Sequence, residues 1–180
     1  MPIKRKKYKV AQDGDFEMAI GGTGSPATNR RAVHQSESKK STNAKRYVVI
    51  GRKPESHMTA FEKMNMARAG ISKKSLEIMK AKAGLGYEKL ASTLSITKAT
   101  LINKKRGQKY GRTLSERIVG LADIYSFGFE VFGDQRRFNE WMASPNCALG
   151  GKAPVDVAGS LFGREEVRNI IGRIDYGVYS

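Results

Sequence analysis

The sequence lacks the side chains that disulfides, metal centres and membrane spans require. Cys147 is the only cysteine in 180 residues, so the chain cannot form an internal disulfide. The two histidines, His34 and His57, have no partners at the spacing of a zinc site. No apolar stretch reaches the length of a signal peptide or a membrane span. These absences predict a cytoplasmic protein with no metal, no cofactor and no membrane contact.

Acidic side chains are also few. The chain has 33 lysines and arginines against 17 aspartates and glutamates, which gives a net charge of +16. Basic residues exceed acidic ones by eight in residues 1–60 and again by eight in residues 61–133, whereas residues 134–180 carry equal numbers. An excess of this size attracts nucleic acid, because cationic side chains neutralise phosphates. The electrically balanced C-terminal stretch predicts a second task there.

A catalytic arrangement is missing as well. The carboxylates are scattered along the chain, and no Ser/His or Cys/His pairing has the pattern of a nucleophile with its base. We therefore predict that the chain is not an enzyme.

Residues 1–43 show no sustained apolar period and are rich in Lys, Gly, Ser, Thr and Asn. This composition predicts a basic, mostly disordered arm, which we extend to residue 60. Its first Lys/Arg cluster suits a solubilising tail and an arm in the DNA minor groove equally well. Near the end of the arm, the run Tyr47–Ile50 is compatible with one short strand, although no second strand lies nearby to pair with it.

From residue 61 onward, apolar residues recur at helical spacing. We expect an all-α chain, with a lambda-repressor-like helix-turn-helix bundle in residues 61–125 and a small helical domain in residues 126–180. Capping residues mark the expected helix ends. They are Ser72 and Gly84 around a first helix, Thr97 and Gly107 around a helix Lys98–Arg106, the capping box Thr113–Glu116, Asp134 before a helix with Trp141, and Asp175 at the end of a last helix that begins near Arg164.

Residues 87–106 have the layout of a helix-turn-helix, in which a short helix and a three-residue turn precede a second helix that can enter the major groove. With Leu101 facing inward, the outward face of this second helix carries side chains suited to reading bases, with Asn for adenine and Arg for guanine. Flanking cations would hold phosphates. The candidate DNA-binding residues are Lys98, Thr100, Ile102, Asn103, Lys104, Lys105, Arg106, Lys109 and Arg112. A Lys-rich helix is often only a solvent-exposed face. This helix is the third one of a three-helix pattern, however, and that position favours a role in DNA binding.

Several segments in order carry a family resemblance over about residues 70–180. They are the pattern from Leu90 to Leu101, Glu130–Asp134, Trp141–Met142, Pro145–Asn146, Ala148–Pro154 and Gly172–Ser180. In these segments the chain resembles the Xre/MbcA/ParS antitoxins, with Ser95 where the Xre-like family usually has a glycine at a position of positive φ. The resemblance implies a RES-domain toxin as partner, one that consumes NAD or modifies proteins with its ADP-ribose. It also implies repression of the chain's own operon at double-stranded operator DNA.

The resemblance further implies which residues meet the toxin. The expected toxin-binding residues are Leu149, Gly150, Gly151, Arg164, Arg168, Arg173, Tyr176, Val178, Tyr179 and Ser180. The aromatic chain end would enter or cover the toxin's active site, although from the sequence alone it could equally pack on its own domain. A homodimer within a larger complex is expected through Phe127, Phe129, Phe132 and Trp141.

Two other functions stay open at the level of sequence. One is a stand-alone helix-turn-helix repressor without a toxin. The other is a basic RNA-binding protein, against which the zero net charge of residues 134–180 argues.

Overall fold

The computed structural model describes residues 47–105 and 107–177, and in these ranges the fold is all-α, as expected. The described residues contain no strand, only two isolated bridges that join Ser72 to Lys109 and Asn146 to Lys152. The helices, in chain order, are η1 (Glu55–His57), α2 (Ala60–Ala69), α3 (Lys73–Ala83), α4 (Tyr87–Thr93), α5 (Lys98–Ile102), α6 (Arg112–Phe132), α7 (Gln135–Ala143), η2 (Cys147–Leu149), α8 (Pro154–Val157) and α9 (Leu161–Asp175).

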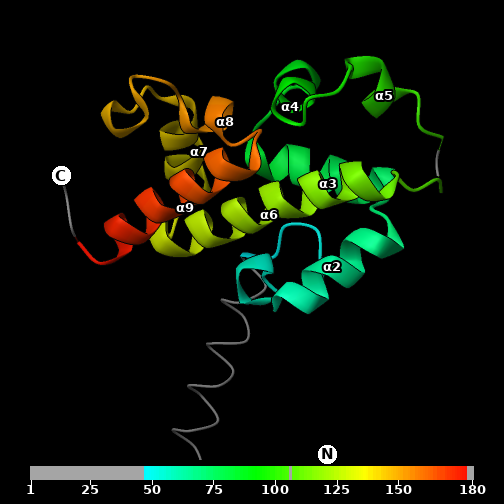
Figure 1. Ribbon diagram of the computed structural model, residues 1–180, viewed down its shortest axis with the longest axis horizontal. Helices are drawn as coiled ribbons and strands as arrows, with labels where there is room; N and C mark the ends of the chain where they lie inside the picture. The colour runs from blue at the N-terminus through cyan, green and yellow to red at the C-terminus, as the bar shows by residue number, and fades with distance from the viewer. Residues whose placement is uncertain (1–46, 106, 178–180) are drawn as a thin grey trace, which may run out of the picture.

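Helix α6 is the axis of the fold (Figure 1), because η1, α2, α3, α7 and α9 all contact it. Its apolar residues recur on every side of its second half, and ten of its residues are buried. A helix that is apolar all round needs cover on several faces, which the surrounding helices supply. The buried residues form one continuous core through the described residues. Helix α6 runs across residue 125, the boundary expected between the two domains, so this boundary lies inside a helix.

The aromatic centre of the core lies between α6 and α7. Phe138 on α7 is fully buried and meets Tyr125, Phe129 and Phe132 of α6 edge-on, with ring centroids 5.2 to 5.6 Å apart. Burial raises the pKa of the Tyr125 hydroxyl. Gly128 allows this close approach, since a Cβ there would lie 2.1 Å from two ring carbons of Phe138.

Helices α3, α4 and α5 are three short helices in succession, and α4 and α5 fall within residues 87–106, where a helix-turn-helix is expected. Ser72 caps α3 by accepting from the Ser75 N–H, and Gly84 ends it in the left-handed conformation at φ 65°. Thr97 caps α5 in the same way through the Thr100 N–H. Between α4 and α5, Ser95 takes a φ of 53°, the one positive φ outside glycine among the described residues. The serine therefore adopts the backbone that glycine favours, at a cost of about 1–2 kcal/mol.

Three expected helix boundaries are wrong. The helix from Lys98 ends at Ile102 and not at Arg106, because the Tyr110 hydroxyl and the Lys73 ammonium take the carbonyls of Leu101 and Ile102.

The capping box at Thr113 does not form, since α6 already begins after Gly111. Ser115, inside the expected box, instead accepts from the Ile71 N–H and donates to the Tyr110 carbonyl. The last helix begins at Leu161, three residues early, because Ser160 caps it through the Gly163 N–H.

The expected strand at Tyr47–Ile50 is also wrong, and the segment 47–59 is folded although it was assigned to the arm. The fully buried Glu55 carboxylate accepts the N–H groups of Val49, Ile50 and Gly51 at 2.8, 2.7 and 2.6 Å. These donors are therefore not free for a strand partner. Residues 1–46 lie outside the described residues.

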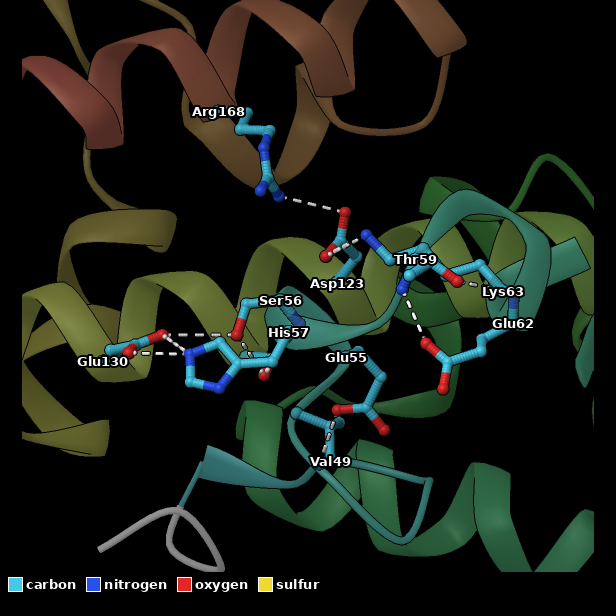
Figure 2. Close-up of polar contacts among 11 residues, drawn as sticks. Val49, Glu55, Ser56, His57, Thr59, Glu62, Lys63, Asp123, Glu130 and Arg168 are labelled. Carbon is cyan, nitrogen blue, oxygen red and sulfur yellow. Dashed lines mark hydrogen bonds and ion pairs between the residues drawn. The ribbon is translucent and has the colours of Figure 1, made fainter. Parts of the chain in front are cut away.

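Three contacts fix the segment 47–59 to the helices (Figure 2). His57 Nε2 contacts both carboxylate oxygens of Glu130 on α6, at 2.9 and 3.0 Å. Ser56 contacts Ser126 and Glu130 of the same helix. Thr59 and Glu62 form a capping box at the start of α2, and the hydrogen bond from Lys53 lowers the pKa of Glu62 to about 2.

Replacing Glu55 with glutamine should destabilise the protein by about 2–4 kcal/mol, because hydrogen bonds to a charged acceptor are worth about 1.5–3 kcal/mol and the new amide cannot accept through its nitrogen. Thermal unfolding followed by circular dichroism measures the loss. Glu88→Gln is the control, since that exposed carboxylate makes only a surface ion pair and its loss should leave the melting temperature nearly unchanged. Equal melting temperatures for both variants would contradict the role given to Glu55.

Within the described residues, none of the helices is both long and apolar enough to cross a lipid bilayer.

Candidate functional site

The DNA-reading face expected on α5 is exposed in the structure. Thr100, Ile102 and Asn103 are exposed while Leu101 is fully buried against the core, as the expected orientation requires. The Thr100 hydroxyl lies 2.8 Å from the Thr97 hydroxyl. Arg106, the expected guanine reader, lies outside the described residues. The short α5 therefore presents Asn103 at its C-cap and not within a longer helix.

Most of the cations expected to hold phosphates contact their own chain. Lys98 pairs with Glu88 at 2.8 Å and lowers the pKa of that carboxylate. Lys109 donates to the carbonyl of Ala69, at 2.8 Å.

Two more of these cations also have partners. Arg112 pairs with Glu116 at 3.0 Å, and Lys104 lies 5.8 Å above the Tyr110 ring. Lys105 is exposed beside them. Exposed pairs of this kind are worth about 0.2–1 kcal/mol, so phosphates could compete for the cations.

In the C-terminal region, the loop at Leu149–Gly151 is a tight turn. Gly150 and Gly151 have φ values of 64° and 78°, and the Asn146 side chain caps η2 through the Ala148 N–H. A Cβ at either glycine would meet nothing within 4 Å. The positive φ values explain why glycine stands at both positions. The open space around them leaves the turn accessible to a partner.

A hollow of about 570 Å³ lies between the end of α6, α7, η2 and the second half of α9. It brings together Phe132 and Trp141, both expected at a dimer interface, and Arg173, expected in the toxin contact. The rings of Phe132 and Trp141 lie 5.6 Å apart, and Arg173 pairs with Glu166 at 3.1 Å. The hollow combines half-buried aromatic rings with an exposed guanidinium, a composition typical of protein-binding surfaces.

Phe129, expected at a dimer interface, is a core residue. It is fully buried between Tyr125 and Phe138, so its ring cannot meet a second chain in this fold. Phe127, Phe132 and Trp141 are only partly buried.

A second hollow, a groove of about 900 Å³, lies between α2, α6 and the first half of α9. At its base Asp123 of α6 joins three helices, with Lys63 of α2 at 2.8 Å and Arg168 of α9 at 3.0 Å (Figure 2). The Arg168 guanidinium also lies 4.7 Å from the Phe127 ring centre. Arg168, expected to meet a toxin, therefore holds α9 against α6.

Arg164 has a similar internal role. It donates to the carbonyls of Ala158 and Gly159 at 3.4 and 3.2 Å, and its partial burial, together with the nearby Arg117 charge, lowers its pKa. Both α9 arginines that line the groove thus have partners in their own chain.

Sequence reasoning missed two exposed apolar residues at the start of α9. Leu161 and Phe162 are 67% and 81% exposed, and Tyr176 at the other end of α9 is 84% exposed. The sequence signal for this earlier start of α9 was Ser160, an N-cap residue type whose side chain accepts from the Gly163 N–H. Val178, Tyr179 and Ser180, expected in the toxin contact, lie outside the described residues.

Comparison with known proteins gives a match for the C-terminal part of the chain. Residues 128–177 match the family described as the Antitoxin Xre/MbcA/ParS C-terminal toxin-binding domain. Every residue that lines the hollow between α6, α7, η2 and α9 falls in this range. The matched stretch therefore contains a complete candidate binding surface.

Relatives of known name are similar over part of the chain. Antitoxin Xre of Yersinia enterocolitica serotype O:8 is 33% identical over 67 residues, which make up 37% of this chain and 45% of that protein. The chain thus matches less than half the length of this curated relative. The crystal structure of the M. tuberculosis MbcT-MbcA toxin-antitoxin complex contains a chain that superposes with a TM-score of 0.45 at 19% identity, over 68% of this chain and 100% of that one. At this TM-score the likeness supports no inference about function.

Proposed function

We propose that this chain is an antitoxin, which binds a toxin through residues 128–177 and the chain end and keeps it inactive. The match of these residues to a toxin-binding domain carries the proposal. The partial match to an antitoxin of Yersinia enterocolitica points the same way. Neutralisation would be steric, by covering the toxin's active site, and the chain itself would do no chemistry. We place this action in the cytoplasm.

The resemblance in the sequence extends this proposal to the kind of toxin. The partner would be a RES-domain enzyme that consumes NAD or transfers its ADP-ribose. Antitoxin and toxin would form a larger complex, with an antitoxin homodimer joined through the exposed parts of Phe127, Phe132 and Trp141.

The same chain would repress its own operon. Helices α4 and α5 would form the helix-turn-helix, and α5 presents Thr100, Ile102 and Asn103 on a face bordered by lysines. Two such helices in a dimer would read half-sites about one DNA turn apart. In this arrangement Asn103 and Arg106 read bases, and Lys98, Lys104, Lys105, Lys109 and Arg112 hold phosphates.

Asn103→Ala should weaken binding to the specific operator by about 1–3 kcal/mol, because a side chain bonded to a base edge contributes about that much discrimination. Lys105→Ala should instead weaken binding to all DNA sequences about equally and reduce the slope of log K against log salt by about 0.9. Fluorescence anisotropy with operator and scrambled duplexes at several salt concentrations separates the two effects. Unchanged operator affinity for Asn103→Ala would place base reading elsewhere.

A stand-alone repressor is the second candidate, and the helix-turn-helix layout alone would suit it. The test is growth rescue by co-expression with the product of the gene next to this chain's own, alongside operator binding. A repressor without a toxin would bind the operator and leave growth unaffected by its neighbour.

A further inference from the structure

The exposed face of α9 is a ridge between the two hollows of the C-terminal region. Phe162, Glu165, Asn169, Gly172 and Tyr176 follow one another at steps of three and four residues, so they lie along one side of the helix. Phe162, Glu165, Asn169 and Tyr176 are exposed, while Gly163, Val167, Ile170 and Ile171 are buried on the opposite side. We call these five residues the α9 ridge.

The ridge has a shape that suits a large partner. Leu161, Arg164 and Arg168 border the groove of about 900 Å³ on one flank, and Ile170, Arg173 and Ile174 border the hollow of about 570 Å³ on the other. Figure 1 shows α9 lying along α6 and leading to the chain end. At 1.5 Å per residue, Phe162 and Tyr176 stand about 21 Å apart along the helix axis, about four helical turns.

The ridge also has the composition of an interface. Phe162 and Tyr176 are among the most exposed large apolar residues described, at 81% and 84%. Aromatic residues of this kind supply much of the energy of protein contacts, so an exposed pair at the two ends of one helix face marks a binding surface.

Its charge favours a protein over a nucleic acid. Residues 161–177 carry three arginines and three acidic residues, so they are neutral in a chain of net charge +16. A phosphate backbone would be drawn to the basic surface near α5 instead. The ridge lies inside the stretch that matches a toxin-binding domain, and its C-terminal end leads directly into the tail.

We propose that the α9 ridge is the docking surface for the toxin, with Phe162 and Tyr176 as its two anchors. This inference rests on the proposed antitoxin function and names the surface that performs it. The partner would lie across α9, with protruding segments in the two flanking hollows. The turn at Leu149–Gly151 would then lie at the margin of the contact.

Gly172 allows a test that leaves the fold intact. A Cβ at Gly172 would meet nothing within 4 Å, so Gly172→Trp adds bulk to the ridge without an internal clash. Phe162→Ser removes one anchor. Phe61→Ser is the matched control, because Phe61 on α2 is 64% exposed, lies outside the ridge and lies outside the matched stretch.

The measurement is calorimetric titration of each full-length variant with the purified product of the adjacent gene. We expect Gly172→Trp and Phe162→Ser to raise the Kd at least tenfold, while Phe61→Ser binds as the wild type does. Operator binding should stay unchanged, and none of the variants should unfold at a lower temperature than the wild type.

Three results would overturn the inference, and they can be told apart. If the wild type fails to bind, the antitoxin proposal fails and the ridge proposal fails with it. If the wild type binds and the ridge variants bind equally well, the ridge proposal alone is wrong. If the ridge variants change only the mass of the free protein in light scattering, the ridge joins copies of this chain.

Discussion

Gly128→Ala is expected to lower the free energy of unfolding by about 3 kcal/mol, a large effect for the addition of one methyl group. The new Cβ would lie 2.1 Å from Cε2 and Cζ of Phe138, far inside van der Waals contact. Phe138 cannot yield easily, since it is fully buried and packed against four other rings. Overpacking in cores costs about 1–3 kcal/mol and sometimes more, which outweighs the gain of about 0.5–1 kcal/mol from replacing a helical glycine.

Gly172→Ala is the matched control for this experiment. It makes the same change in another helix, but its Cβ meets nothing within 4 Å. It should therefore stabilise the protein by about 0.5–1 kcal/mol. Thermal unfolding should move the two melting temperatures in opposite directions, and a Gly128→Ala protein as stable as the wild type would contradict the close packing of α6 on α7.

Deletion of residues 176–180 is expected to abolish toxin neutralisation and leave operator binding intact. The deletion begins after the last residue of α9, and the first residue removed, Tyr176, is 84% exposed, so α9 keeps all of its buried residues. The apolar side chains of Tyr176, Val178 and Tyr179 would in our proposal reach the toxin's active site. Growth of cells that express the toxin measures neutralisation, and anisotropy with the operator shows that the truncated chain is folded.

Arg173→Glu is a milder test of the same region. Arg173 lines the hollow between α6, α7 and η2, and a carboxylate there cannot donate the hydrogen bonds that the guanidinium would donate to a toxin pocket. The variant should weaken neutralisation without loss of stability, since the Glu166 pair that it breaks is a surface pair.

For the deletion of residues 176–180, the contradicting outcome is rescue of growth by the truncated chain at equal abundance. The tail would then be only a structural end.

Local signals in the sequence predicted much of the fold. Caps at Ser72, Thr97 and Asp134 act within three residues of themselves, and each forms as expected. The orientation of α5 followed in the same way from Leu101, the single buried residue of that helix.

The features that the sequence did not predict depend on contacts over longer distances. Tyr110 and Lys73 end α5 early by taking its last carbonyls, from nine and 29 residues away. Glu55 takes the amides of an expected strand, and the packing of Phe138 makes a core residue of Phe129, expected at an interface. The exposure of Phe162 depends on which side of α9 packs on α6, a fact of tertiary structure. Periodicity shows that a helix has an apolar side, but neighbours decide what covers it.

The most direct test of the account is growth rescue in cells that express the product of the adjacent gene. The account predicts that the intact chain restores growth, that the chain without residues 176–180 does not, and that both bind the operator with equal affinity. An intact, stably expressed chain that fails to restore growth would contradict the antitoxin function.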